Sequence, residues 1–484
     1  MRQPFFLGTA ALAGVGIVAA CVGEDPNPVE TPPPDAAASD APENDTGTPC
    51  NATCLGVCVD LKHDSNNCGG CGKSCTTDAG ITFACVEGAC GNAVVQVSAG
   101  DTNACVLLLD GTVWCWGDQK YGITGVTDST PTSLPKKVPG LTDVAEIAVA
   151  SVYGVARRRD GTVVGWNGAD GVTPIAFADK VVQISAAFAA ACGRTAGGAV
   201  ACWGIGLTGV LGKYPEDDGG VVYSKTTAIP IAGLESDVVD VSVGAGAMGT
   251  DRLAASACAV KKDGTVWCWG SNLRGELGHT NTDEGDKPCE SSQTCNPSPR
   301  LVRNASDAGI TGITRVHVGD VTACALKTEG SVLCWGAGRY GVANQGISNN
   351  VPLAAAQVNG LNTTASLYFG GNVAHVVDIS GNVKAWGLNG GGELGVGGED
   401  GYGCWAGGLC KPPTNAPLLK DAKQISVGYR TGVALMGSGK VLTWGLNSDD
   451  QLGHPGGTNL DTQCTDAGGS IYCNPSPAEV IGLP

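Results

Sequence analysis

The chain has 484 residues, a formal net charge of −17 and 23 cysteines; glycine contributes 75 residues and charged residues only 15%. The acidic balance argues against a nucleic-acid binder, because phosphate is neutralised by Lys and Arg. So many cysteines argue against a reducing compartment. The glycine excess has no collagen period and indicates many tight turns.

The first twenty residues have the pattern of an export signal. Arg2 precedes an apolar run that is too short for a spanning helix. The run ends in Val-Ala-Ala-Cys21, which resembles a bacterial lipobox; an ordinary signal with a chance cysteine is the alternative. The resemblance implies cleavage before Cys21 and acylation of its thiol, and Val22, where Asp would favour the inner membrane, favours the outer one. We expect a signal peptide over residues 1–20 and an exported lipoprotein of the bacterial cell envelope, anchored in the outer membrane.

A spacer follows the acylated cysteine. Residues 22–49 hold seven Pro, seven acidic residues and no Lys or Arg. Such a segment cannot bury apolar surface and repels itself. With Cys21 it forms a disordered acidic linker over residues 21–49.

A small cysteine-rich module is predicted over residues 50–91. About forty residues cannot form a sufficient core unaided, so four disulfides are expected, with connectivity open. Zinc bound through Cys68-Gly-Gly-Cys71 is one alternative and a redox CxxC another. The string around this pair resembles a short motif at the front of many secreted bacterial surface proteins, which implies no chemistry. The eight cysteines are Cys50, Cys54, Cys58, Cys68, Cys71, Cys75, Cys85 and Cys90.

The rest of the chain repeats one frame seven times. In the first copy the turn Asp110-Gly111 is followed five residues later by Trp116-Gly117. A Val/Ile-rich run precedes each turn, and a Gly-rich tail, often ending in Leu-Gly, follows most of the tryptophans. The second copy departs once, with Asn167 in place of the glycine after Trp166. Short alternating runs with Gly turns predict an all-β fold. The six further tryptophans of the frame are Trp166, Trp203, Trp269, Trp335, Trp386 and Trp444.

Cysteine spacing supports this hairpin geometry. In four copies two cysteines lie ten residues apart, and counting outward from Asp110-Gly111 places Cys105 opposite Cys115. Directly opposed residues of a hairpin are within disulfide reach. The other expected hairpin pairs are Cys192 with Cys202, Cys258 with Cys268, and Cys324 with Cys334. The pairs expected in the tails are Cys289 with Cys295, Cys404 with Cys410, and Cys464 with Cys473.

The frame resembles the regulator of chromosome condensation repeat. This resemblance implies a seven-bladed β-propeller over residues 92–484. Relatives of the repeat include a nucleotide exchange factor for a nuclear GTPase, a role that the export signal excludes here, and a secreted bacterial inhibitor of β-lactamase. We expect the last Pro-led segment, residues 477–484, to pair into the first blade and close the ring.

No catalytic, cofactor or metal site is predicted. The string Gly390-Gly-Gly-Glu-Leu-Gly395 matches a dinucleotide fingerprint but occupies a tail shared by the blades and opens no helix. We expect His317 and His375 to be packed in strands, and His279 and His454 to be exposed. An acidic solvated loop is favoured over a Ca²⁺ site around Asp286.

Function is therefore expected to reside in loops on the ring faces. We predict a non-enzymatic protein that binds a protein or polysaccharide partner; the alternatives are an extracellular carbohydrate-active or other hydrolytic enzyme and a secreted enzyme inhibitor. Trp405 is the sharpest candidate, although it could equally pack over its own disulfide. The candidate partner-binding residues are Tyr121, Arg274, Arg339, Tyr340, Tyr402, Trp405 and Tyr472.

Overall fold

The computed structural model describes the chain from residue 52 to residue 484, with gaps. The predicted signal peptide, Cys21, the linker and Cys50 lie outside the described residues. The gaps are residues 55, 63, 77–83, 87–88, 92, 126–129, 189, 215–221, 246–253, 280–284, 290–292, 339–340, 344–351, 399–400, 404–408 and 467–468.

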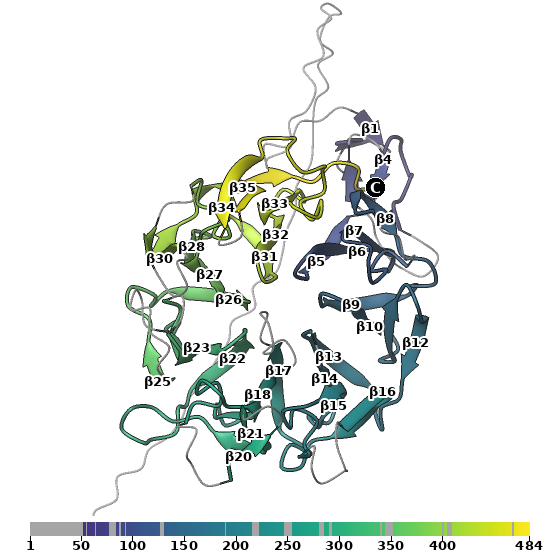
Figure 1. The fold of residues 1–484 in the computed structure, drawn as a ribbon. Helices are drawn as coiled ribbons and strands as arrows, with labels where there is room; N and C mark the ends of the chain where they lie inside the picture. The colour runs from purple at the N-terminus through teal and green to yellow at the C-terminus, as the bar shows by residue number, and fades with distance from the viewer. Residues whose placement is uncertain are drawn as a thin grey trace, which may run out of the picture.

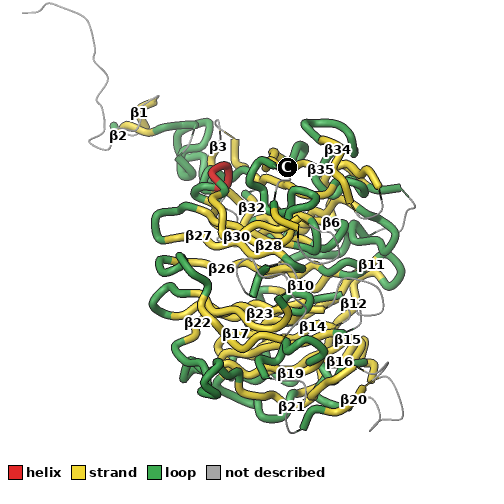
Figure 2. Tube along the Cα trace, turned by 60° about the vertical axis from the view of Figure 1, so that its left-hand side comes forward, coloured by secondary structure: helices red, strands yellow, loops and turns green. Residues whose placement is uncertain are grey.

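The cysteine-rich module contains two short hairpins. Strands β1 (Ala52–Cys54) and β2 (Val57–Val59) form one, and β3 (Ala84–Val86) and β4 (Ala89–Gly91) form the other. Disulfides join Cys54 to Cys71 and Cys68 to Cys85, so the CxxC cysteines have different partners and do not form a thiolate pair for zinc. The module lies outside the ring of sheets (Figure 2).

Seven antiparallel sheets form the rest of the molecule and are arranged around a central axis (Figure 1). The predicted seven-bladed β-propeller is confirmed. Blade one contains β5 (Val94–Ala99), β6 (Asn103–Leu108), β7 (Val113–Gly117) and β8 (Thr132–Lys137). Blade two contains β9 (Val144–Val149), β10 (Gly154–Arg158), β11 (Val163–Asn167) and β12 (Gly171–Ile175). Blade three contains β13 (Val181–Ala186), β14 (Ala190–Thr195), β15 (Val200–Gly206) and β16 (Val222–Pro230).

The remaining blades follow in chain order, three of them with a fifth strand. Blade four contains β17 (Val238–Ala245), β18 (Ala255–Lys261), β19 (Val266–Ser271), β20 (Lys287–Cys289) and β21 (Gln293–Leu301). Blade five contains β22 (Ile313–Val318), β23 (Thr322–Lys327), β24 (Val332–Ala337) and β25 (Pro352–Gln357). Blade six contains β26 (Thr364–Gly370), β27 (Val373–Asp378), β28 (Val383–Leu388), β29 (Tyr402–Gly403) and β30 (Leu409–Asn415). Blade seven contains β31 (Ala422–Val427), β32 (Thr431–Met436), β33 (Val441–Leu446), β34 (Thr462–Asp466) and β35 (Gly469–Glu479).

The central hairpins fold as their turn residues dictate. Gly111 has φ of 80°, a left-handed conformation that glycine adopts without steric cost. The Gly111 N–H donates to the Leu108 carbonyl (2.9 Å), and Cys105 then faces Cys115, as predicted. The turn glycines of the other six hairpins have φ between 75° and 87°. Local turn chemistry therefore sets the register of all seven hairpins.

The hydrophobic core lies between blades rather than within them. Each pair of neighbouring blades encloses one buried cluster, and each cluster contains the tryptophan of the second blade, such as Trp269 between blades three and four. Trp116 belongs to the cluster that joins blade seven to blade one. The frame tryptophans are thus the anchors that join successive blades.

The prediction that the C-terminal segment pairs into blade one is wrong. Strand β35 pairs with β33 and β34 of its own blade, and β8 completes blade one from within the first repeat. The C-terminal segment reaches blade one through side chains instead, because Val480 packs in the cluster that contains Trp116. The Pro-led strand after each tail is therefore the outer strand of the same repeat.

Side-chain hydrogen bonds between inner strands complete the ring. The Gln424 Oε1 accepts the N–H of Val97 (3.0 Å), and the Ser426 Oγ accepts the N–H of Ala99 (2.9 Å). Gln96 and Ser98 repeat this arrangement from blade one to blade two. These bonds satisfy strand-edge N–H groups that would otherwise be unpaired.

A single-turn 3-10 helix, η5 (Pro417–Leu419), connects blades six and seven. Within the described residues, the structure contains no helix whose length and apolar character would let it cross a bilayer.

Candidate functional site between blades two and three

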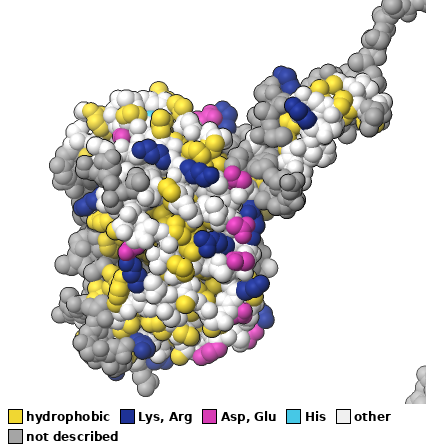
Figure 3. All heavy atoms as spheres, turned by 90° about the vertical axis from the view of Figure 1, so that its right-hand side faces the viewer, with side chains coloured by type: hydrophobic (Ala, Val, Ile, Leu, Met, Phe, Trp, Pro, Cys, Tyr) yellow, Lys and Arg dark blue, Asp and Glu magenta, His cyan; other side chains and the backbone are white. Residues whose placement is uncertain are grey.

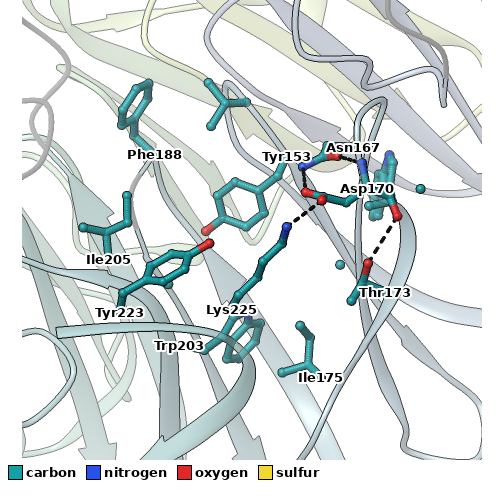
Figure 4. Close-up of a pocket in the computed structure, with 15 residues that line it drawn as sticks. Tyr153, Asn167, Asp170, Thr173, Ile175, Phe188, Trp203, Ile205, Tyr223 and Lys225 are labelled. Atoms are coloured by element: carbon teal, nitrogen blue, oxygen red, sulfur yellow. Dashed lines mark hydrogen bonds and ion pairs between the residues drawn. The ribbon is translucent and has the colours of Figure 1, made fainter.

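A pocket opens where blade two faces blade three. Its volume is about 210 Å³, and Tyr153, Trp203, Tyr223 and Lys225 are among the residues that line it. Figure 4 shows the two tyrosines and Lys225 grouped around its centre. The pocket is therefore partly aromatic and also contains a charged group.

The pocket exists because blade two lacks a tail. In the other six blades the glycine after the tryptophan has φ between 97° and 110° and lies at an irregularity in the pairing with the outer strand, shortly before the tail begins. At Gly117 a Cβ atom would lie 2.4 Å from the Thr102 carbonyl oxygen, so only glycine fits. Asn167 has no positive φ, and β11 runs through a short turn directly into β12. The space that a tail would occupy is left open.

The missing tail leaves one indole without a hydrogen-bond acceptor. In six blades the tryptophan Nε1–H donates to a tail carbonyl of the preceding blade at 2.8–3.2 Å. Trp203 follows the blade without a tail. Although Trp203 is only 3% exposed, no described residue accepts a hydrogen bond from its indole N–H. The donor–acceptor pairs are Trp116–Gln451, Trp166–Ile123, Trp269–Val210, Trp335–Glu276, Trp386–Val342 and Trp444–Glu393.

An ion pair lies at the edge of the pocket. The Lys225 Nζ is 2.5 Å from the Asp170 Oδ1, and the Asn167 Nδ2–H donates to the Asp170 Oδ2 (3.0 Å). The hydrogen bonds from Lys225 and Asn167 lower the pKa of Asp170, and the bond to Asp170 raises the pKa of Lys225. Both groups are charged at neutral pH, and Asn167 fixes the turn that replaces the tail.

Side-chain contacts connect the residues of the inner wall of the pocket. Tyr153 donates its hydroxyl to the Ala187 carbonyl (3.0 Å), and burial raises the pKa of Tyr153. Phe177 packs edge-to-face against Trp203, with ring centroids 5.4 Å apart. These contacts hold the walls in place in the absence of a tail.

The sequence-predicted binding residues whose side chains are described lie in three different blades. Tyr121 is exposed in blade one beside Lys120, whose Nζ lies 5.3 Å from the ring centroid. Arg274 is half-buried in the tail of blade four, and Tyr472 is exposed on β35 of blade seven. Arg339, Tyr340, Trp405 and the side chain of Tyr402 lie outside the described residues. On the side shown in Figure 3, cations and anions are interspersed rather than gathered into a patch of one sign.

The four hairpin pairs of cysteines are all disulfides. Their Cα–Cα distances are 4.0–4.1 Å, and none of the eight cysteines has exposed surface. They are therefore structural cross-links inside the blades and not part of a reactive surface. The bonds join Cys105 to Cys115, Cys192 to Cys202, Cys258 to Cys268, and Cys324 to Cys334.

The tail cysteines are joined as the spacing pairs them wherever both partners are described. Cys289 is joined to Cys295 and Cys464 to Cys473. Cys410 is disulfide-bonded, while Cys404 lies outside the described residues.

The expectation that His279 and His454 are exposed is wrong. The His279 side chain is 6% exposed, and its Nε2 lies 3.1 Å from the Oδ1 of Asp286, which is itself buried. Asn272 and Asn296 also donate to Asp286. Burial raises the pKa of Asp286, but the hydrogen bonds from His279 and the two asparagines outweigh it and bring the pKa below its usual value.

Blade seven repeats this cluster. His454 and Asp461 are buried 2.9 Å apart, and Asn447 donates to Asp461 at 2.7 Å. In both blades the spacing is Asn-x6-His-x6-Asp, followed three residues later by a disulfide cysteine. Asp286 therefore belongs to a structural polar cluster rather than to a solvated loop.

Sequence reasoning missed the pocket residues, although two signals pointed to them. Asn167 breaks the Trp-Gly pair, and the spacing from Trp166 to Trp203 is 37 residues, shorter than the other spacings of 50 to 66. Both follow from the absent tail. Tyr223 and Lys225 carry no motif, because β16 approaches blade two only in the folded ring.

Comparison with known proteins identifies the repeat. Family descriptions of the "Regulator of chromosome condensation (RCC1) repeat" match residues 94–123, 238–276 and 422–451, and a second one with the same description matches residues 263–326. These segments of the propeller are therefore similar to the RCC1 repeat. The matched segments contain the inner strand, the hairpin or the tail of blades one, four, five and seven.

Individual curated proteins are similar to parts of the chain. Protein pim1 of Schizosaccharomyces pombe is 26% identical over 64% of this chain and 56% of its own length, and the ultraviolet-B receptor UVR8 of Arabidopsis thaliana is 24% identical over 74% and 78%. The human E3 ubiquitin-protein ligase HERC2 is 30% identical over 48% of the chain, but that match spans only 4% of HERC2.

Solved structures show the same RCC1 fold. Prp20p from Saccharomyces cerevisiae superimposes with a TM-score of 0.61 at 15% identity, over 81% of this chain and 88% of that one. Human WBSCR16 gives a TM-score of 0.53 at 18% identity, over 71% and 87%.

Proposed function

We propose that the protein is an exported lipoprotein of the cell envelope, anchored in the outer membrane through Cys21, whose propeller binds a protein or polysaccharide partner without catalysing a reaction. The observation that supports binding is the pocket between blades two and three, which is lined by Trp203 at the position where the other blades have a tail. The anchor rests on the lipobox-like sequence before Cys21.

Relatives support binding as the general role. Prp20p binds Gsp1p and histones, and Kap60 has been crystallised bound to it. Among the described residues that line the pocket, Asp170 is the only carboxylate. Because the ion pair with Lys225 holds its pKa down, Asp170 is unsuited to act as a general acid at neutral pH, and glycoside hydrolysis normally needs a second carboxylate. Secreted inhibition of an enzyme would be one form of protein binding.

The anchor is tested by fatty-acid labelling in cells. We expect the wild type to incorporate the label and to fractionate with the outer membrane, Cys21→Ser to remain unlabelled, and Val22→Asp to be labelled but retained at the inner membrane. Labelling of Cys21→Ser would contradict the anchor.

Binding is tested by capture from cell-envelope extract on the full-length Cys21→Ser protein. We expect Tyr223→Ala, which removes a 61% exposed ring at the pocket, to lose the captured partner. Tyr472→Ala is the matched control, since it removes a 43% exposed ring from blade seven. Capture that survives Tyr223→Ala but is lost in Tyr472→Ala would contradict the pocket as the binding site and would indicate a binding surface on blade seven.

A further inference from the structure

The tails of the other blades show which structure normally fills the position that is open between blades two and three. In five blades part of the tail is a four-residue turn closed by an N–H to carbonyl bond, as from Gly278 to Gly275 (2.9 Å) and from Gly395 to Gly392 (3.1 Å). In the turns of blades four, six and seven, the second residue supplies the carbonyl that accepts from the next tryptophan, and the third is a leucine with no exposed surface. The recurring sequence is Gly-x-Leu-Gly, with Asp450 replacing the first glycine in blade seven.

The glycines of this turn allow its backbone conformation and its close approach to the tryptophan of the next blade. Gly275, Gly278, Gly392 and Gly395 all have positive φ, so the turn is a shape that few other residues adopt. A Cβ on Gly395 would lie 3.0 Å from the ring of Trp444. The turn therefore packs flat against the next tryptophan while its second carbonyl meets the indole N–H.

We infer that the pocket between blades two and three receives a β-turn of the Gly-x-Leu-Gly type from a partner polypeptide, in the place of the missing tail. This inference rests on the proposed binding function and names its partner as a protein. The carbonyl of residue x accepts from the Trp203 Nε1–H, and the leucine packs against apolar wall residues such as Ile175. Lys225 and Tyr223 contact the chain on either side of the turn.

The chemistry of the pocket favours a peptide turn over a sugar. The indole N–H of Trp203, in the pocket lining, is a donor, and a carbonyl accepts from it without bringing further donors into the site. A pyranose brings several hydroxyl donors that each need an acceptor. The pocket volume of about 210 Å³ is below the roughly 300–1,000 Å³ of drug-sized sites, which suits the tip of a turn rather than a chain of rings.

The test uses the ten indole N–H resonances of the full-length protein labelled with ¹⁵N-tryptophan. The probe is the peptide Asn-Gly-Gly-Gly-Glu-Leu-Gly-Val, which reproduces residues 389–396, and its Leu→Asp version is the control. We expect saturable movement of the Trp203 resonance, assigned with Trp203→Phe, and at least tenfold weaker binding of the control. A Trp203 resonance that stays fixed while the peptide is raised to millimolar concentration would overturn the inference, as would equal binding of the control peptide.

A loop graft provides an independent measurement. Replacing residues 167–170 with the tail 387–397 supplies the missing turn from within the chain. We expect the graft to move the Trp203 resonance to the position seen with peptide and to abolish peptide binding, while Ile379→Ala, which removes a 77% exposed side chain from the hairpin turn of blade six, leaves binding unchanged. Peptide binding that persists in a folded graft would overturn the inference.

The two proposals fail separately. If a partner is captured in a Tyr223-dependent manner but the peptide does not move Trp203, partner binding stands and the turn is wrong. Saturable movement of the Trp203 resonance with maltohexaose, and none with the peptide, would indicate a polysaccharide partner. This result would contradict the inferred β-turn and leave the pocket as the binding site.

Discussion

At the residue scale, a single buried histidine gives the ring a pH-dependent element. His375 lies in β27 with no exposed surface, its Nε2 is 3.1 Å from the Leu394 carbonyl oxygen, and its ring packs beside Trp444. Burial lowers the pKa of His375 to about 4, although the hydrogen bond to Leu394 opposes this shift. The native state therefore favours the neutral imidazole.

This shift predicts a loss of stability on acidification. Because the pKa is lower in the folded state than in the unfolded state, the contribution is fully present above about pH 6.5 and is lost as the pH falls toward 4. Across this window the free energy of unfolding should fall by on the order of 3 kcal/mol from this group. The measurement is urea denaturation at pH 7.5, 6, 5 and 4.

A matched variant comes from the chain itself. Valine occupies the position of His375 in blades two and seven, at Val155 and Val433. His375→Val should remove most of this pH dependence while remaining folded at pH 7.5. An unchanged pH profile in that variant would assign the acid sensitivity to other groups, such as Asp286.

At the element scale, the hairpin disulfide is optional for a blade. Blade seven has Val433 opposite Thr443 where blade one has Cys105 opposite Cys115. Both pairs lie in the same register, so the hairpin forms without the bond.

The double variant Cys105→Val, Cys115→Thr places in blade one the Val–Thr pair that blade seven has at Val433 and Thr443. The disulfide closes a loop of about eleven residues, and its loss should lower the free energy of unfolding by about 2–3 kcal/mol in the chain-entropy model. Thermal melting under oxidising conditions measures this loss. With excess reductant the difference from wild type should shrink, and a difference that persists would indicate poorer packing of the new pair.

Elements were predictable from sequence where their causes are local. The turn at Asp110-Gly111 and the pairing of Cys105 with Cys115 depend on adjacent residues, and the structure has both. The burial of His279 was not predictable, because it depends on Asp286 and Asn296, which approach only when the tail folds back. The pocket escaped prediction for the same reason, since it is formed by an absent tail.

At the scale of the whole molecule, the ring is closed by packing. Val480 is 6% exposed and shares the interface cluster with Trp116, while its N–H donates to the Val441 carbonyl (2.9 Å). The last residues thus support the joint between blades seven and one without adding a strand to blade one.

Truncation of this joint should weaken the entire ring. Val480→Ala removes buried methyl groups and should cost about 2 kcal/mol of unfolding free energy, and deletion of residues 480–484 should cost more. Ile481→Ala is the control, because Ile481 is 61% exposed and should change stability little. Calorimetry measures both, and an unchanged melting temperature in the deletion would show that the C-terminal segment does not support the ring.

Because the ring closes without strand exchange, the chain could start at any blade and keep the same order of blades around the ring. Each blade is complete within its own repeat, and the Gln424 and Ser426 bonds across the joint have the same form as the Gln96 and Ser98 bonds inside the chain. A circular permutant that links residue 484 to residue 93 and begins at residue 236, between blades three and four, keeps every sheet intact. The fold therefore has seven junctions between blades at which a chain could start without dividing a sheet.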